Sequence, residues 1–266
     1  MNMEDLKIIL VQASLAWEET GENLTRFERL LSQVEGPADL VLLPETFNTG
    51  YSINPGKCAE SMFGPTVKFL LDAARRLDAV VMGTLLVRES CRTYNRLVCA
   101  FPDGRHEMYD KRHLFRLSEE YKVFTPGRRQ RIVEIRGWKV ALTVCYDLRF
   151  PVWCRNTWHD GEYGYDLLVC LANWPATRSH VWRTLLAARA MENQAFVAGV
   201  NRVGDDGYGT PHAGHSMVID AKGRILKEAA EGAEEICAVT LCAEDLRLFR
   251  ESFTVGMDWD RFEMKQ

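Results

Sequence analysis

The chain has 266 residues, of which 47% are hydrophobic and 26% are charged, and its net charge at pH 7 is −4. This is an ordinary globular composition, and the dispersed basic residues give no indication of a surface for nucleic acid or for an anionic membrane. No apolar run reaches the roughly 18–20 residues of a membrane span, and the N-terminal segment has no signal-peptide pattern.

The first half of the chain alternates short apolar runs with amphipathic segments. Apolar runs predict buried strands, and apolar residues at helical spacing predict helices with one buried face. We therefore expect strands at Leu6–Ala13, Leu40–Leu43 and Ala79–Val87, and helices at Asn23–Val34 and Pro65–Leu77. The segment Asn48–Lys57 is rich in Gly, Pro and Asn and should form a loop.

Hairpins are frequent in the second half, where turn residues separate neighbouring strands. The predicted pairs are Tyr94–Phe101 with His106–Tyr109, Ile132–Ile135 with Trp138–Val144, and Ser216–Asp220 with Arg224–Lys227. The other expected elements are strands at Asp166–Ala172, Ala195–Asn201 and Ile236–Leu241, and helices at Val181–Gln194 and Glu244–Arg250. Helices that alternate with strands, together with hairpins, predict one α/β domain with mixed sheets, with a core over about 5–242 and a C-terminal tail over 243–266.

The cysteines are scattered along the chain and include no CxxC pair. This usage indicates free thiols in a reducing compartment and argues against a disulfide framework or a structural zinc site. The expected location is therefore the cytoplasm. The eight positions are Cys58, Cys91, Cys99, Cys145, Cys154, Cys170, Cys237 and Cys242.

The stretch Lys139–Pro151 is the first candidate for chemistry. Its apolar run, Val140–Val144, ends at Cys145, where charged residues begin. A cysteine at the exit of a buried strand is held rigidly and can present its sulfur to a cleft, with backbone N–H groups nearby for a developing oxyanion. The alternative is that Cys145 is a small buried hydrophobic residue, as most cysteines are.

Two further polar residues follow apolar strands. Glu45 comes after Leu40–Leu43, and a carboxylate partly removed from water at a strand end is a candidate general base. Lys111 precedes His113 and could hold an oxyanion with its ammonium group. Each residue taken alone is more often a solvated surface residue. Because strand ends gather at one edge of an α/β sheet, the three residues together indicate a cleft.

These residues lie in motifs that resemble the nitrilase, or carbon–nitrogen hydrolase, superfamily. The matching motifs are LLPET around Glu45, YDKRHLF around Lys111 and TVCYDLRFP around Cys145, in the chain order of the Glu–Lys–Cys triad of that superfamily. The segments ARAMENQAFV and GHSMVID extend the resemblance over nearly the whole chain, and CYDLRFPVW and LANWP look most like the ω-amidase branch. The resemblance implies a four-layer α-β-β-α sandwich, which agrees with the mixed pattern above.

The resemblance also implies roles for these residues. Cys145 would attack the amide carbon, Glu45 would move the protons, and Lys111 with the backbone N–H of Tyr146 would hold the oxyanion. A second glutamate is expected after the lysine, and Glu120 fits that position better than its neighbour Glu119. Neither a metal nor another cofactor is required. A homodimer is expected, and the implied substrates are small 2-oxo acid monoamides such as 2-oxoglutaramate and 2-oxosuccinamate, hydrolysed through a cysteinyl thioester.

The residues that recognise the substrate are harder to identify from the sequence. A carboxylate needs a cation or converging N–H groups, and Arg149 is either that cation or a structural arginine buried against Asp147. Candidates for the pocket wall are Phe47, Tyr51 and Trp174, and each could equally belong to the core. Arg178 is a further cation candidate, although a surface role fits it better.

Three alternatives remain open from the sequence. A hydrolase with a papain-like Cys–His mechanism would use His113 or His215 as its base. This alternative leaves the LLPET and YDKRH stretches without a role. A hydrolase of another small aliphatic amide or N-carbamoyl compound would share the triad. A catalytically silent metabolite-binding scaffold should lack a triad residue, and all three are present here.

Overall fold

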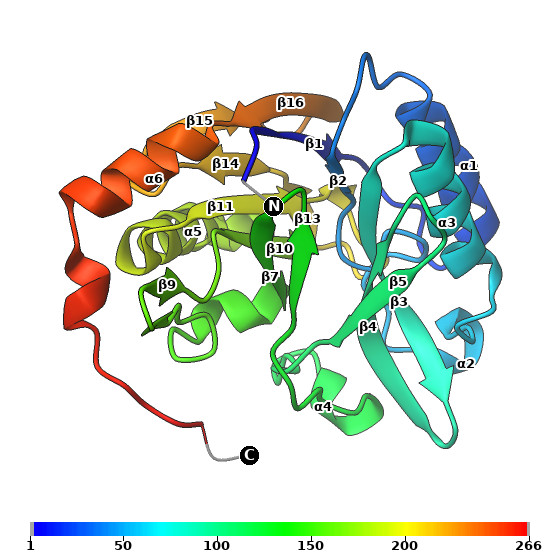
Figure 1. The fold of residues 1–266 in the computed structure, drawn as a ribbon. Coiled ribbons are helices and arrows are strands. Elements are labelled where there is room, and N and C mark those ends of the chain that lie inside the picture. The colour runs from blue at the N-terminus through cyan, green and yellow to red at the C-terminus, as the bar shows by residue number, and fades with distance from the viewer. Residues whose placement is uncertain (1–2, 265–266) are drawn as a thin grey trace.

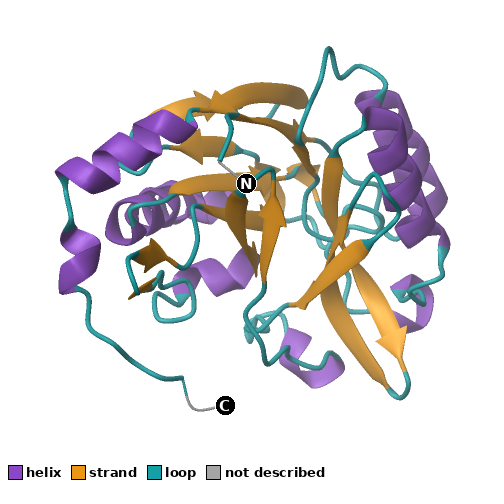
Figure 2. Ribbon diagram, viewed as in Figure 1, coloured by secondary structure: helices purple, strands orange, loops and turns teal. Residues whose placement is uncertain are grey.

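The computed structural model describes residues 3–264, in which two six-stranded sheets pack face to face with helices on their outer sides (Figures 1 and 2). The first sheet has the order β16-β1-β2-β3-β4-β5 and the second the order β15-β14-β11-β10-β7-β6. The central strands of both sheets run parallel to their neighbours, and antiparallel strands complete the edges. The candidate residues therefore come from two different sheets.

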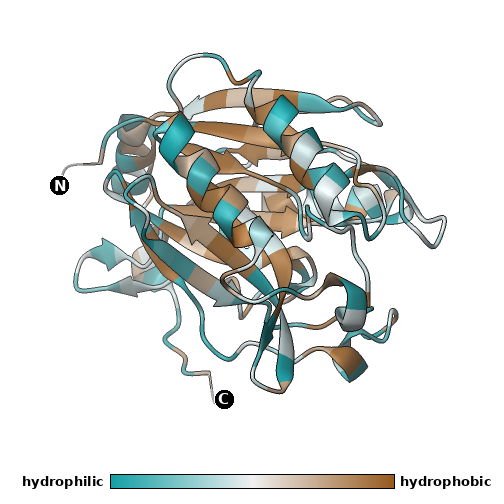
Figure 3. Cartoon of the chain, turned by 90° about the vertical axis from the view of Figure 1, so that its right-hand side faces the viewer, coloured by the Kyte–Doolittle hydropathy of each residue, from teal (hydrophilic) through white to brown (hydrophobic). Residues whose placement is uncertain are grey.

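The first sheet is built mainly from the N-terminal half. Its strands are β1 (Leu6–Gln12), β2 (Leu40–Leu42), β3 (Val80–Glu89), β4 (Arg92–Ala100), β5 (His106–Asp110) and, from the C-terminal part, β16 (Glu235–Leu241). Helices α1 (Thr20–Leu31) and α3 (Pro65–Leu77) cover its outer face. Figure 3 views the molecule from the side of these two helices and shows hydrophobic residues gathered on the strands behind them.

The second sheet follows in the C-terminal half. Its strands are β6 (Ile132–Ile135), β7 (Trp138–Val144), β10 (Leu167–Ala172), β11 (Phe196–Asn201), β14 (Met217–Ile219) and β15 (Ile225–Glu228). Helix α5 (Ser179–Asn193) lies on its outer face, and α6 (Ala243–Ser252) packs at the end of the sandwich. Two short ribbons, β8 (Trp158–His159) with β9 (Glu162–Tyr163) and β12 (Val203–Asp205) with β13 (Pro211–Ala213), lie outside the main sheets.

Three apolar clusters hold the layers together. One lies between the sheets and includes Leu10 and Val140, one joins the first sheet to α1 and α3, and one joins the second sheet to α5. Strands buried on both faces are continuous hydrophobic runs, which explains why their positions were readable from the sequence. The clusters define four layers, so the predicted α-β-β-α sandwich is confirmed.

The structure differs from the sequence prediction at several short elements. The expected loop Asn48–Lys57 contains the start of helix α2 (Pro55–Cys58), which Asn54 caps by accepting a hydrogen bond from the N–H of Lys57 at 3.3 Å. Helix α4 (Glu120–Val123) and both ribbons were not predicted, because elements of two to four residues carry no periodicity. All eight cysteines are free, as expected. Among the described residues, no helix combines the length and the apolar character that a membrane span needs.

Candidate active site

The three predicted polar residues come together at strand ends. Glu45 lies shortly beyond β2, Lys111 directly follows β5, and Cys145 directly follows β7. Lys111 and Cys145 line a cavity of about 260 Å³. Glu45 does not line the cavity itself but contacts the Lys111 side chain behind the cavity wall. Glu45 and Lys111 follow strands of the first sheet, and Cys145 follows a strand of the second. The site therefore forms only when the two sheets pack together.

A buried ion cluster lies at the base of the cavity. The Nζ atom of Lys111 lies 2.9 Å from Oε1 of Glu45, and 3.1 and 3.0 Å from the two carboxylate oxygens of Glu120. The lysine side chain is 1% exposed, and both glutamates are completely buried. Two carboxylates thus share one ammonium group away from water.

This burial perturbs the protonation of the cluster. Burial by itself lowers the pKa of Lys111, but Glu120 and Glu45 outweigh it and hold that pKa well above its usual value. Burial also raises the pKa of Glu120, with a further increase from Glu45, while Lys111 acts in the opposite direction. The lysine therefore remains a cation.

The second glutamate in contact with Lys111 is Glu120 and not Glu119. Glu120 also accepts a hydrogen bond from the N–H of Phe115 at 2.6 Å, which closes the loop before α4. Glu119 is exposed and pairs with Lys122 at 2.5 Å. Neighbouring residues point in different directions at this turn, where Glu119 adopts a left-handed conformation with φ of 63°.

Cys145 begins a 3₁₀ helix over Cys145–Arg149 and has a positive φ of 44°. A left-handed conformation costs a non-glycine residue about 1–2 kcal/mol, so the turn is held by its surroundings. Cys145 is half-buried, and its Sγ atom lies 3.7 Å from the carbonyl oxygen of Asn173. Burial, and next the negative charge of Glu45, raise the pKa of the Cys145 thiol well above its usual value, although Lys111 lowers it. The resting sulfur is therefore a thiol.

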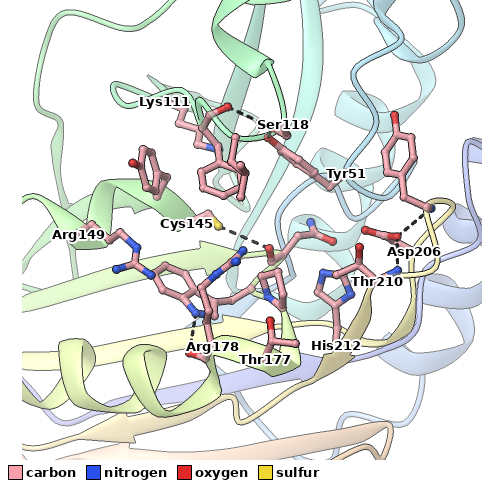
Figure 4. A pocket seen from close by; sticks show the side chains of 17 residues that line it. Tyr51, Lys111, Ser118, Cys145, Arg149, Thr177, Arg178, Asp206, Thr210 and His212 are labelled. Atoms are coloured by element: carbon pink, nitrogen blue, oxygen red, sulfur yellow. Dashed lines mark hydrogen bonds between the residues drawn. The ribbon is translucent and has the colours of Figure 1, made fainter.

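The wall of the cavity contains most of the side chains proposed for recognition. Tyr51, Arg149, Trp174 and Arg178 all line it, and Figure 4 shows Tyr51, Arg149 and Arg178 around Cys145. The guanidinium of Arg149 lies 5.1 Å from the ring centre of Trp174, which is a cation–π contact. Arg149 is therefore part of the cavity wall and not buried against Asp147.

Phe47 is not part of this wall. Its ring is fully buried between the first sheet and its helices, 5.2 Å from the ring centre of Phe27. It fills the space beside Gly83, where a Cβ atom would lie 2.7 Å from the ring. The structure thus assigns Phe47 to the core, the alternative that the sequence left open.

Comparisons with known proteins agree with this geometry. A carbon–nitrogen hydrolase family profile matches residues 7–251. The chain is 41% identical to an ω-amidase of Yersinia enterocolitica, with 98% of this chain and 99% of that protein covered, and 33% identical to a 2-oxoglutaramate amidase of Bacillus subtilis, with 94% and 96% covered. A crystal structure from Xanthomonas campestris, described as a CN-hydrolase superfamily protein with an arsenic adduct in its active site, superposes with a TM-score of 0.97 at 43% identity and covers 99% of this chain and all of its own.

The chain belongs to the carbon–nitrogen hydrolase family. The family predicted from the three motifs is therefore confirmed, and the protein is a hydrolase of carbon–nitrogen bonds.

Two asparagines of this hydrolase hold Glu45 in place and were not singled out in the sequence. Asn95 on β4 donates from Nδ2 to Oε1 of Glu45 at 2.8 Å, and the backbone N–H of Asn173 donates to Oε2 at 2.9 Å. Both are buried. Asn173 belongs to the LANWP motif that the sequence offered as a sign of the family, but its contact with Glu45 spans 128 residues.

The ribbon β12–β13 supplies the opposite wall of the cavity, which sequence analysis also missed. Asp206, Tyr208, Thr210 and His212 line the cavity, and Figure 4 labels Asp206, Thr210 and His212. The Oδ1 atom of Asp206 accepts hydrogen bonds from the backbone N–H groups of Tyr208 and Thr210, each at 2.9 Å. Burial, reinforced by Arg202, lowers the pKa of His212 to about 4, so this imidazole is neutral at pH 7.

The histidines considered for a papain-like mechanism have other partners. His113 lies with Nδ1 2.8 Å from Oδ1 of Asp147, and His215 lies with Nδ1 3.0 Å from Oε1 of Glu228. Neither residue lines the cavity that contains Cys145. The contacts of these two histidines therefore do not support the papain-like alternative.

Proposed function

We propose that the protein is an ω-amidase that hydrolyses the terminal amide of small 2-oxo acid monoamides, such as 2-oxoglutaramate and 2-oxosuccinamate. The products are the dicarboxylic 2-oxo acid and ammonia. The relatives named ω-amidase and 2-oxoglutaramate amidase support this substrate class. The observation that carries the proposal is a small cavity with a Cys–Lys–Glu set at its base and two arginines in its wall.

In the first half of the reaction, Cys145 forms a thioester. Its thiol proton passes to Glu45 while the sulfur attacks the amide carbon, because the thiol is protonated before substrate arrives. The ammonium of Lys111 and the backbone N–H of Tyr146 bind the oxyanion. When the tetrahedral intermediate collapses, the carbon–nitrogen bond breaks and the leaving ammonia takes the proton from Glu45.

In the second half, water replaces ammonia. Glu45, again a carboxylate, removes a proton from water, whose oxygen attacks the thioester carbon. Collapse of the second oxyanion breaks the carbon–sulfur bond, releases the carboxylic acid and returns the proton to Cys145. Asn95 and Asn173 keep both oxygens of Glu45 oriented through this cycle.

The charges of the cavity favour an anionic substrate. Arg149 and Arg178 line it, and neither guanidinium lies within ion-pair distance of any carboxylate of residues 3–264. Asp206 is the acidic residue of the wall, and backbone N–H groups already occupy its Oδ1 atom. Two unneutralised guanidinium groups suit the carboxylate of a 2-oxo acid.

The size of the cavity favours a short substrate. Pockets for drug-sized ligands have volumes of about 300–1,000 Å³. The volume of about 260 Å³ lies just below that range. A five-carbon monoamide fits this space better than a peptide side chain attached to its backbone.

The test is ammonia release from three amides of equal chain length. These are 2-oxoglutaramate, glutaramate, which lacks the oxo group, and pentanamide, which also lacks the carboxylate. Wild type should prefer the first by a large factor in kcat/KM, and Cys145→Ala should abolish turnover. Arg149→Ala and Arg178→Ala should each lower kcat/KM for the two anions by roughly 10–100-fold, the value of a charge-assisted hydrogen bond, and leave pentanamide within about threefold.

Arg183→Ala is the matched control, because Arg183 is a half-exposed arginine that pairs with Glu228 outside the cavity. It should change none of the three rates. Equal losses for anionic and uncharged amides in Arg149→Ala and Arg178→Ala would refute recognition of the carboxylate by these residues. Turnover of pentanamide alone would indicate a hydrolase of another small aliphatic amide. No turnover of any substrate, with Cys145 unreactive toward an alkylating agent, would favour the scaffold alternative.

A further inference from the structure

The two halves of the triad must be held at a fixed separation across the sandwich. Glu45 and Lys111 follow strands of the first sheet, whereas Cys145 follows a strand of the second. Glu120, at the start of α4, contacts Lys111. A nucleophile misplaced by about 1 Å can cost 10²-fold in rate. Asn173, which follows β10 of the second sheet, already joins that sheet to Glu45. A further contact joins the cysteine turn to the end of the lysine strand.

The carboxylate of Asp147 makes this contact. It lies two residues after Cys145 and is completely buried. Its Oδ2 atom accepts hydrogen bonds from the hydroxyl of Tyr109 at 2.7 Å and from the N–H of Val144 at 3.1 Å. Its Oδ1 atom accepts from the backbone N–H of His113 at 2.9 Å and from Nδ1 of the same residue at 2.8 Å. Because a carboxylate only accepts, Nδ1 carries the proton.

The partners of Asp147 occur on both sides of the catalytic lysine. Tyr109 precedes Lys111 by two residues and His113 follows it by two residues. Val144 belongs to the other sheet and immediately precedes Cys145. One carboxylate thus joins the strand end that carries the ammonium to the turn that carries the sulfur.

Aromatic side chains fix this arrangement further. The indole N–H of Trp153 donates to the hydroxyl of Tyr109 at 2.9 Å, so that the hydroxyl hydrogen is directed toward Asp147. The ring of His113 is stacked on Phe150, with 3.6 Å between centres and 8° between planes. Such a network has little freedom to adjust if one member is removed.

We infer that Asp147 is a positioning residue that sets the distance between the Cys145 sulfur and the Lys111 ammonium through Tyr109 and His113. It touches neither substrate nor the reacting atoms and also holds the left-handed turn at Cys145. The inference rests on the proposed function in that it takes Cys145 as the nucleophile and Lys111 as the oxyanion donor. It also assigns a role to His113, which is not a base in the proposed reaction.

The first test compares two tyrosine variants. Tyr109→Phe removes the hydroxyl that reaches Asp147 and leaves the carboxylate, its turn and the ring in place. Tyr165→Phe is the matched control, because Tyr165 is also buried and its hydroxyl donates to the carbonyl oxygen of Cys154 at 2.6 Å, away from Lys111. Tyr109→Phe loses two buried hydrogen bonds, to Asp147 and from Trp153, whereas Tyr165→Phe loses one. The loss of Tm should therefore be roughly 2–8 °C in Tyr165→Phe and up to about twice that in Tyr109→Phe.

Their kinetics should differ. Tyr109→Phe should lower kcat by about 10–100-fold with KM within about twofold, because the oxyanion contact matters only after attack. Tyr165→Phe should keep both constants. Asp147→Asn is the second variant, since an amide NH₂ donates only, and whichever oxygen it replaces leaves two of the four donors around Asp147 without an acceptor. Its loss in kcat should be at least as large as that of Tyr109→Phe.

Equal kinetics for Tyr109→Phe and Tyr165→Phe, measured well below the Tm of both variants, would overturn the inference and leave Asp147 a structural carboxylate. The rate of Cys145 alkylation by iodoacetamide provides a readout without any amide substrate, and it should change in Tyr109→Phe but not in Tyr165→Phe. If wild type hydrolyses no amide, the proposed function fails, while the alkylation rates still decide whether Asp147 positions the cysteine. If wild type is active, and Tyr109→Phe and Tyr165→Phe have the same kcat and the same alkylation rate, only the inference about Asp147 fails.

Discussion

Replacement of Lys111 by methionine should reduce catalysis and stability for two separable reasons. The change keeps most of the side-chain volume but removes an ammonium that contacts two buried carboxylates at 2.9–3.1 Å. Loss of one partner from a buried ion pair leaves an uncompensated charge and costs about 3–5 kcal/mol in the free energy of unfolding. Loss of an oxyanion donor costs about 10²–10³ in kcat.

The stability loss should depend on pH. Burial and Glu45 raise the pKa of Glu120, and the Lys111 ammonium opposes this increase. Lys111→Met removes that ammonium, so the pKa of Glu120 should rise further. A carboxyl group whose folded-state pKa is raised stabilises the protein below its unfolded pKa, and this contribution disappears as pH rises through the folded pKa. The difference in unfolding free energy between wild type and Lys111→Met should therefore grow between pH 5 and pH 8, as measured by urea denaturation.

The double variant Lys111→Met/Glu120→Gln separates the two effects. It removes one of the two carboxylates, and the remaining Glu45 keeps its hydrogen bonds from Asn95 and Asn173. The double variant should regain about half of the stability lost, because one buried charge remains. Its kcat should stay low, because no cation is present for the oxyanion. Recovery of kcat together with stability would refute the role of Lys111 as oxyanion donor, and so would a pure increase in KM in the single variant.

Three shorter predictions concern the base, the pocket histidine and metals. Glu45→Gln should fold and lower kcat by about 10²–10⁴-fold, because the amide cannot take the proton of the Cys145 thiol; unchanged single-turnover rates would contradict this. His212 has a pKa of about 4 when folded, so its neutral form contributes stability that falls as pH drops from about 6.5 toward 4. Between pH 7.5 and pH 5 wild type should lose about 2 kcal/mol more than His212→Gln, and equal slopes in urea titrations would refute the shift. Dialysis against EDTA should leave turnover unchanged, and a loss restored by one specific metal would require a different mechanism.

Much of the fold was predictable because the central strands are buried on both faces. Their continuous apolar runs stand out in the sequence, and the amphipathic helices between them show helical spacing. The same feature revealed the three main site residues. Glu45, Lys111 and Cys145 each follow such a run, so local sequence placed them at strand ends. The amino-acid sequences of the three motifs and their order along the chain then indicated the family.

Residues that depend on contacts between distant segments were not predictable in this way. Asn173 reaches Glu45 across 128 residues, and Tyr109 reaches Asp147 across 38 residues. His212, on the ribbon β12–β13, lines the same cavity as Lys111 and Cys145, although both precede it by many residues in the chain. Sequence patterns give the positions of strands along the chain, but not which loops meet when the sheets pack.

Side-chain direction in the loops was likewise decided by the tertiary structure. Phe47 follows Glu45 by two residues but turns into the core beside Gly83, while Arg178 faces the cavity. The sequence alone determined the layered fold, the family and the three residues at strand ends, because burial leaves a local pattern. The packing of the two sheets determined the distances between those residues, their supporting hydrogen bonds and the charged wall around them, because these depend on register and orientation, which leave no local pattern.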